Sequence, residues 1–184
     1  VLFDMDGVLI DSEIGYLNKI YAQVVQRYDF LKREDLYPTV GMDSESERLF
    51  MHRITGEPLD NEAFDVYLEG VHSGIRMDNY RDILNPGVVE TLKFLKDKNY
   101  KMALASSSGM QVIKKVLRQC EIGPFFDFVV SGEQFKESKP NPEIYLTAMK
   151  ALDCKPGECI VIEDSNYGIE AGLLAGAYVI AKRE

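Results

Sequence analysis

The sequence has no tryptophan, three cysteines and two histidines among its 184 residues. The cysteines are odd in number and lack both the spacing of a zinc site and the density of a disulfide-stabilised domain. We therefore interpret Cys120, Cys154 and Cys159 as reduced thiols of a cytoplasmic protein. The two histidines, His52 and His72, fall in a helical stretch and are interpreted as structural or surface residues.

Long apolar runs and positive charge are also scarce. No stretch approaches the roughly 20 apolar residues of a membrane-spanning helix, and no basic and apolar leader precedes the first expected strand. Lysines and arginines total 21 against 30 acids, which gives a formal net charge of -9. A nucleic-acid binder needs a basic stripe to neutralise phosphates. We therefore expect neither a membrane nor a nucleic acid as partner, and we expect a monomer.

Apolar runs alternate with amphipathic stretches along most of the chain. The expected strands are 1–3, 101–106, 126–131, 158–164 and 177–181, and the expected helices are 88–98, 109–120, 142–152 and 166–175. This alternation predicts an α/β fold, a Rossmann-like parallel sheet with helices on both faces. Several runs are apolar at consecutive positions, as in strands buried on both sides. Since the first run begins at Val1, we expect a few residues to precede it.

Residues 14–85 do not follow this alternation. They contain three helical patterns, near 16–28, 45–55 and 61–77, without a convincing strand. A block of helices between the first strand and the remaining series is most simply a domain inserted into one loop. We therefore predict a catalytic α/β core of residues 1–13 and 86–184, and an inserted all-helical cap of residues 14–85.

Polar side chains stand at the ends of the expected strands. In an open parallel sheet, ligands bind beyond the carboxyl ends of the strands, so these side chains are candidates for a functional site. They come from four separate segments and are Asp4, Asp6, Ser106, Lys139, Glu163 and Asp164.

Four acids gathered at one edge would repel one another strongly. Two carboxylates about 4 Å apart repel by roughly 4 kcal/mol at an effective dielectric constant near 20, so the acids should bind a proton or a metal. A set of oxygen ligands favours a hard cation, with Mg²⁺ first. The lysine and serine would then hold an anion beside the metal. A small oxyanion between Mg²⁺ and lysine is most often a phosphoryl group.

Each motif also has a simpler interpretation when it is read alone. Asp4 and Asp6 could form a turn after a strand, and Ser106 could cap a helix. Lys139 could be a solvated surface residue, and residues 163–165 could be the acidic start of a helix. The functional interpretation depends on all four motifs occurring together and in this order.

Four segments resemble the motifs of the haloacid dehalogenase superfamily of phosphatases and phosphotransferases. They are VLFDMDGVLIDSE, LASSS, SKPNPEIY and VIEDSNYGIEAGLLAGA. They follow one another along the chain in the same order, and at the same positions relative to the strands, as in that family. The chain is most similar to the branch that contains beta-phosphoglucomutase and small sugar-phosphate or phosphoglycolate phosphatases. A DxDG stretch also occurs in calcium loops, but Val8 and Ile10 stand where an EF-hand needs oxygen ligands.

The resemblance implies a role for each candidate residue. Asp4 would be the nucleophile that forms an aspartyl phosphate, and Asp6 would be the general acid and base. Mg²⁺ would be held by Asp4, by the backbone carbonyl of Asp6 and by Asp164. Glu163 would orient this site or serve as an alternative ligand. The phosphoryl oxygens would be held by Ser106 and Lys139.

Three functions fit these motifs. A phosphatase lets water attack the aspartyl phosphate, whereas a phosphomutase excludes water and needs a basic cap residue for the second phosphate. In beta-phosphoglucomutases an arginine follows the glycine loop of the cap. Here residues 42–45 after Gly41 are Met-Asp-Ser-Glu, although Arg48, Arg53 or Arg76 could supply the charge. A non-catalytic binding protein would lack a motif residue, and none is missing. We therefore expect a Mg²⁺-dependent phosphatase of a small phosphorylated metabolite, such as a sugar phosphate.

Overall fold

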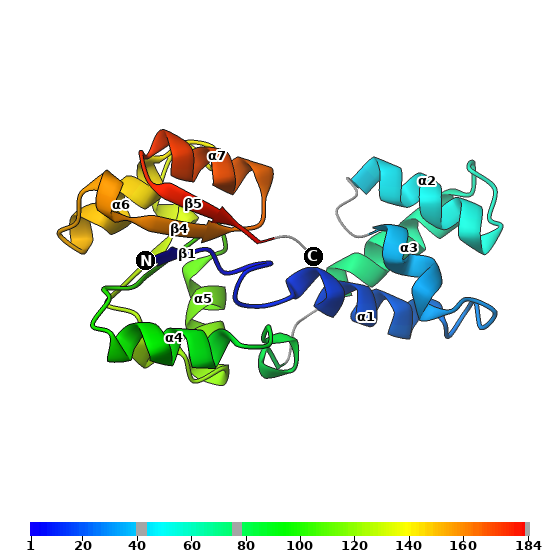
Figure 1. Ribbon diagram of the computed structural model, residues 1–184. Coiled ribbons are helices and arrows are strands. Elements are labelled where there is room, and N and C mark those ends of the chain that lie inside the picture. The colour runs from blue at the N-terminus through cyan, green and yellow to red at the C-terminus, as the bar shows by residue number, and fades with distance from the viewer. Residues whose placement is uncertain (40–43, 75–78, 183–184) are drawn as a thin grey trace. The chain divides into compact units, whose positions relative to one another are not determined.

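The computed structural model describes residues 1–39, 44–74 and 79–182, which form two compact units (Figure 1). One unit consists of Val1–Asp11 and Asn79–Glu184, and the other of Ser12–Asp78. The corresponding predicted ranges were 1–13 with 86–184, and 14–85.

The first unit is built on a parallel sheet of five strands. The strands are β1 (Leu2–Phe3), β2 (Ala103–Ser106), β3 (Phe128–Ser131), β4 (Ile160–Glu163) and β5 (Tyr178–Ala181). Their order in the sheet is β3-β2-β1-β4-β5, and every neighbouring pair is parallel. Each strand lies within one of the five apolar runs, so the predicted fold class is confirmed.

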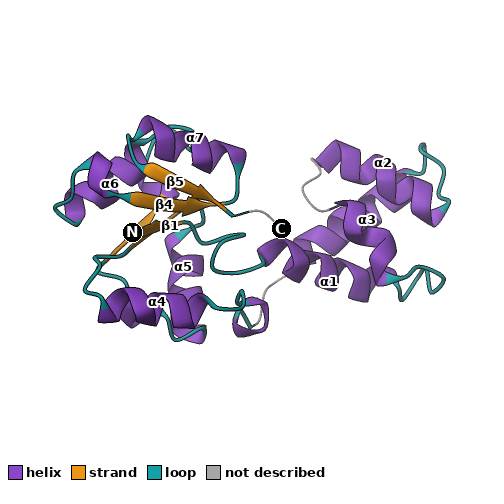
Figure 2. Ribbon diagram, viewed as in Figure 1, coloured by secondary structure: helices purple, strands orange, loops and turns teal. Residues whose placement is uncertain are grey.

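Helices cover both faces of this sheet. They are α4 (Val88–Asp97), α5 (Met110–Gln119), α6 (Glu143–Ala151) and α7 (Asn166–Leu174). Short 3-10 turns lie before and between these helices at η2 (Arg81–Ile83), η3 (Gly123–Phe125), η4 (Gly132–Gln134) and η5 (Pro156–Glu158). Figure 1 shows α4 and α5 on one side of the strands and α6 and α7 on the other, and Figure 2 shows the same layers by type of element.

The central strand buries side chains on both of its faces. Leu2 pairs in register with Ala103 and Val161, and all three belong to the apolar cluster under α6 and α7. Phe3 points to the opposite face, where its ring packs edge-on against Phe126 at 5.9 Å between centroids. A side chain of this size contributes roughly 1.5–3 kcal/mol when it is fully buried. This burial explains the apolar run that precedes Asp4.

The strand order reverses at β1. The chain passes from β1 outward through β2 and β3, and it returns to the other side of β1 for β4 and β5. Such a switch point leaves a crevice beyond the carboxyl ends of the central strands, because the connections leave in opposite directions. The residues that follow β1 and β4 therefore lie at the position where α/β proteins commonly bind ligands.

The second unit consists of helices. They are α1 (Ser12–Val24), η1 (Arg33–Thr39), α2 (Ser44–Thr55) and α3 (Glu62–Gly74). Its core gathers apolar side chains from all of these helices, including Leu17, Leu36, Met51 and Phe64. Over the described residues of this unit, Figure 2 shows helices and loops and no strand. The unit thus has its own hydrophobic core.

All three cysteines lie in the first unit. Cys120 and Cys159 are buried, Cys154 is half-buried, and all three are free thiols. Over the described ranges of the chain, none of the helices combines the length and the apolar character needed to cross a bilayer.

Candidate active site

A lysine ammonium lies between two carboxylates at the ends of the central strands. Asp4 follows β1, Glu163 ends β4, and Lys139 comes from the loop before α6. Lys139 Nζ donates to Oδ1 of Asp4 at 2.6 Å and to Oε1 of Glu163 at 2.7 Å. Its third contact is the backbone carbonyl of Ala105, at 3.2 Å. The side chains of Lys139, Asp4 and Glu163 are 6%, 10% and 1% exposed, so they form a buried ion cluster.

The three charged groups shift one another's pKa values. Burial raises the pKa of Asp4 to about 7, against the opposing charge of Lys139 and with the support of the nearby Glu163 carboxylate. Burial also opposes ionisation of Glu163, but Lys139 holds the pKa of Glu163 below its usual value. Burial opposes ionisation of Lys139 as well, yet the two carboxylates raise its pKa. The charge of Asp4 is therefore the one that a further cation would stabilise most.

The carboxylate of Glu163 is held by five donors. Oε1 accepts from the Tyr145 hydroxyl at 2.9 Å in addition to Lys139. Oε2 accepts from the backbone N–H of Asp164 and from the backbone N–H and the hydroxyl of Ser165, each at 3.0 Å. Such a network fixes the position of the side chain, because moving it would leave buried donors without partners.

Two residues in contact with this cluster were not among the predicted site residues. Tyr145 is fully buried, and its ring centroid lies 4.9 Å from Nζ of Lys139. Gly168 lies in α7, where a Cβ atom would overlap Oε1 of Glu163. Both residues fall inside the quoted motif segments, which was the available signal. Their apolar helical surroundings made them resemble ordinary core positions.

The carboxylates of Asp4, Glu163 and Asp164 form a group that fits a cation. One oxygen from each of the three lies within 4.8 Å of the others. Burial and the charge of Glu163 raise the pKa of Asp164, as expected where acids converge. Gly7 has a φ of +73°, and a Cβ atom there would overlap Oδ2 of Asp164. The residues present, all with oxygen donors, fit a hard divalent cation such as Mg²⁺.

Asp6 and Ser106 both accept a hydrogen bond from Ser108, in the serine loop of residues 106–108. Ser106 is buried at the end of β2, and its Oγ accepts from the backbone N–H of Ser108 at 3.0 Å. The Ser108 hydroxyl donates to Oδ2 of Asp6 at 2.7 Å. The Asp6 side chain is thus held by the serine loop. The predicted role of its backbone carbonyl as a metal ligand stays a prediction.

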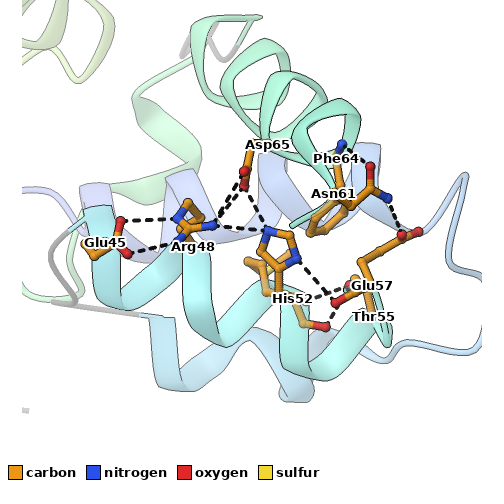
Figure 3. Close-up of polar contacts among 9 residues, drawn as sticks. Glu45, Arg48, His52, Thr55, Glu57, Asn61, Phe64 and Asp65 are labelled. Carbon is orange, nitrogen blue, oxygen red and sulfur yellow. Dashed lines mark hydrogen bonds and ion pairs between the residues drawn. The ribbon is translucent and has the colours of Figure 1, made fainter. Parts of the chain in front are cut away.

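The helical unit contains a separate charged network around Arg48. The Arg48 guanidinium donates to both carboxylate oxygens of Glu45, at 2.9 and 3.1 Å, and to Oδ1 of Asp65 at 3.3 Å (Figure 3). The buried imidazole of His52 also contacts Oδ1 of Asp65, at 2.8 Å from Nε2. Two carboxylates therefore compensate the charge of Arg48 within the unit itself.

The other two arginines considered for a second phosphate differ from Arg48. The Arg53 guanidinium lies over the ring of Phe50, at 4.9 Å from its centroid. Arg76 lies outside the described residues, as do Gly41 and the two residues after it. Arg48 is also one of the residues that line a cavity of about 750 Å³ between α2 and α3.

Named relatives match almost the whole chain. A phosphorylated carbohydrates phosphatase of Thermotoga maritima is 37% identical, over 96% of this chain and 81% of its own length. The pyrophosphatase PpaX of Bacillus thuringiensis (strain Al Hakam) is 27% identical, over 98% of this chain and 81% of its own length. Among solved structures, a putative beta-phosphoglucomutase from Thermotoga maritima superposes with a TM-score of 0.71 at 33% identity. That match covers 98% of this chain and 83% of the other.

The family model described as haloacid dehalogenase-like hydrolase matches residues 1–182. This range includes all described residues of both compact units and every candidate site residue. The motif resemblance, the sheet order and the relatives thus lead to the same family. The chain belongs to the haloacid dehalogenase-like hydrolases.

Proposed function

We propose that this enzyme is a Mg²⁺-dependent phosphatase of a small phosphorylated carbohydrate, and that it works through an aspartyl phosphate on Asp4. The observation that carries the proposal is the buried cluster in which Lys139 bridges Asp4 and Glu163 beside Asp164. A buried acid with a raised pKa, a fixed cation and a further acid nearby are features of sites tuned for chemistry.

The metal would be held by Asp4, by Asp164 and by the backbone carbonyl of Asp6. When bound, Mg²⁺ supplies charge that neutralises the phosphoryl oxygens and keeps Asp4 ionised. Glu163 is better suited to orient the site than to bind the metal, because both of its oxygens already accept hydrogen bonds. Its contacts to Lys139 and to the start of α7 would fix the lysine and the segment that carries Asp164.

Asp4 would act as the nucleophile. One of its carboxylate oxygens attacks phosphorus, and the bond from phosphorus to the sugar oxygen breaks. Asp6 donates its proton to that oxygen as the sugar leaves. Water then attacks the aspartyl phosphate while Asp6 takes a proton from it, and phosphate departs with Asp4 restored. Ser106 and Lys139 would hold the phosphoryl oxygens through both steps.

The names of the relatives support a carbohydrate as the leaving group. The 37% identical relative is called a phosphorylated carbohydrates phosphatase. The structural relative at 33% identity carries the name of a mutase, so isomerisation of a sugar phosphate is the second candidate. The ion pairs of Arg48 with Glu45 and Asp65 favour hydrolysis, because a guanidinium already bound to two carboxylates is poorly suited to bind a second phosphate.

Residues 1–13 and 86–184 would be the catalytic core, and residues 14–85 would be a cap that selects the leaving group. The enzyme would act as a monomer in the cytoplasm on a small metabolite, with neither nucleic acid nor membrane as partner.

The test is one assay with two readouts. The enzyme is incubated with a panel of sugar phosphates, with EDTA or with Mg²⁺, and both free phosphate and isomerised sugar phosphate are measured. We expect free phosphate only with Mg²⁺. Full turnover in EDTA would contradict the metal site, and rapid isomerisation with little free phosphate would favour the mutase.

A further inference from the structure

The carboxylate of Asp6 has a hydrogen-bond donor that the proposed mechanism does not use. Ser108 Oγ donates to Oδ2 of Asp6 at 2.7 Å, and the two residues are 102 positions apart in the sequence. Both side chains are half-buried. A short hydrogen bond to a carboxylate in such a position restricts its rotation about the bond to Cβ.

Ser108 is itself held by the neighbouring strand end. Ser131, the last residue of β3, is fully buried, and its hydroxyl donates to the backbone carbonyl of Ser108 at 2.8 Å. Ser131 Oγ also accepts from the backbone N–H of Glu133 at 3.2 Å, so the hydroxyl joins two loops. The N–H of Ser108 donates to Ser106, which fixes the same residue from a second side.

The loop after β3 supports the serine loop at two further points. Glu133 Oε2 accepts from the backbone N–H of Met110 at 3.0 Å, at the start of α5. Gly132 packs so closely that a Cβ atom there would lie 3.0 Å from Cα of Ser107. The backbone of the serine loop is thus fixed from β3, and the hydroxyl of Ser108 faces Asp6 from a rigid support.

We propose that Ser108 is a positioning residue that orients the carboxyl of Asp6 for proton transfer, with Ser131 fixing Ser108. This inference rests on the proposed function, because it assigns Asp6 the proton that the leaving oxygen receives. A carboxyl held at one oxygen presents the other in a fixed direction. The role predicts that loss of the Ser108 hydroxyl slows only those substrates whose leaving group needs a proton.

The experiment compares two phosphate esters with Mg²⁺ present. The leaving group of glucose 6-phosphate is an alkoxide that requires a proton, whereas p-nitrophenyl phosphate releases a stabilised phenolate that does not. The measured quantity is kcat/KM, because it covers the steps up to release of the first product and is insensitive to the later attack of water.

Ser108→Ala should lower kcat/KM for glucose 6-phosphate about tenfold and change that for p-nitrophenyl phosphate less than about twofold. Ser108→Thr keeps a hydroxyl and should restore most of the loss. Ser107→Ala is the matched control, since the Ser107 side chain is exposed, and both esters should be hydrolysed as by the wild type.

Each outcome bears on the inference. Suppose that the wild type hydrolyses both esters. If Ser108→Ala then loses activity equally towards both esters, or loses none towards either, the proposed role of Ser108 is wrong and the phosphatase proposal stands. A wild-type enzyme inactive towards both esters, and towards the sugar phosphate panel, would overturn the proposed function and this inference with it.

Discussion

Gly7 lies so close to Asp164 that a methyl group on its Cα would overlap Oδ2 of the Asp164 carboxylate. The backbone of Gly7 also has a φ of +73°, which side chains of L-amino acids rarely adopt. Lys182 Nζ donates to the Gly7 carbonyl at 2.6 Å, and Asn85 Nδ2 donates to it at 3.2 Å. Two side-chain donors therefore hold the Gly7 carbonyl, while the Asp164 carboxylate lies close to the Gly7 Cα.

Gly7→Ala should lower Mg²⁺ affinity, because the added methyl group must displace the carboxylate of Asp164. We expect a loss of roughly 10- to 100-fold, as for other changes that misorient a metal ligand. Calorimetric titration with Mg²⁺ measures it. The matched control is Gly87→Ala, whose φ of +80° carries the same backbone strain but whose Cβ would meet nothing within 4 Å. The shared backbone strain should cost each variant about 1 kcal/mol of stability, and the displacement of Asp164 should add to the loss in Gly7→Ala. Equal Mg²⁺ affinity in the two would contradict the proposed ligand.

Replacement of Lys139 should destabilise the first unit strongly. Lys139→Met leaves the carboxylates of Asp4 and Glu163 buried without their cation, a change that typically costs about 3–5 kcal/mol. Urea unfolding in EDTA at neutral pH measures this. The control is Lys96→Met, which removes an ion pair with Asp127 whose side chains are 43% and 38% exposed. Because solvent screens that pair, its loss should cost less than about 1 kcal/mol. Similar losses of unfolding free energy in both variants would contradict a buried ion cluster around Lys139.

Asp4→Asn should prevent formation of the phosphoenzyme, because an amide is not a nucleophile towards phosphorus. Asp6→Asn should still accept substrate, with chemistry slowed by about 10²- to 10⁴-fold for an alkyl ester, as for other lost acid-base groups. Acid quenching with a ³²P-labelled sugar phosphate measures both effects. Label on Asp4→Asn protein, or wild-type turnover by it, would exclude Asp4 as the nucleophile.

The strands and the convergence of the candidate site residues could be predicted because their signals are local. Apolar runs such as residues 1–3 and 158–164 predict buried strands, and an acid directly after such a run is conspicuous. Parallel strands then bring Asp4, Lys139 and Glu163 to one edge, as found in the structure. The order of the segments along the chain and the parallel direction of the strands were enough to predict that these side chains lie close together.

The contacts between side chains could not be predicted in the same way. Tyr145 shares a helical face with Ile144, Ala148 and Met149, so its pattern is that of a core residue. Only the packing of α6 against the sheet brings its hydroxyl to Glu163, at the end of β4. Likewise, residues 106–108 are three consecutive serines that the sequence alone does not distinguish. Only the path of the backbone decides that the hydroxyl of Ser108 reaches Asp6.

Asp127 should make stability depend on pH in acid. The hydrogen bond from Lys96 and that from the backbone N–H of Met102 hold the pKa of Asp127 below its usual value. A lowered pKa in the folded state adds stability above the usual pKa, and this is lost as the pH falls through the folded pKa. The difference in unfolding free energy between wild type and Asp127→Asn should therefore be less than about 1 kcal/mol near pH 6 and should decrease as the pH falls through the folded pKa of Asp127. Urea unfolding across this range tests it, and a constant difference would contradict the assignment.

The charge of Arg48 separates hydrolysis from isomerisation. Its guanidinium is bound to Glu45 and Asp65, so in a phosphatase it would hold α2 and α3 together rather than grip a phosphate. Arg48→Ala should then lower the thermal stability of the protein while phosphate release from p-nitrophenyl phosphate survives within about threefold. In a mutase the same change would remove a charge-assisted contact to the second phosphate, worth roughly 1.5–3 kcal/mol, or about 10- to 150-fold. Arg53→Ala is the control, because that guanidinium lies over Phe50. Rapid conversion of beta-glucose 1-phosphate to its 6-phosphate isomer by the wild type, lost in Arg48→Ala alone, would replace the phosphatase assignment by the mutase.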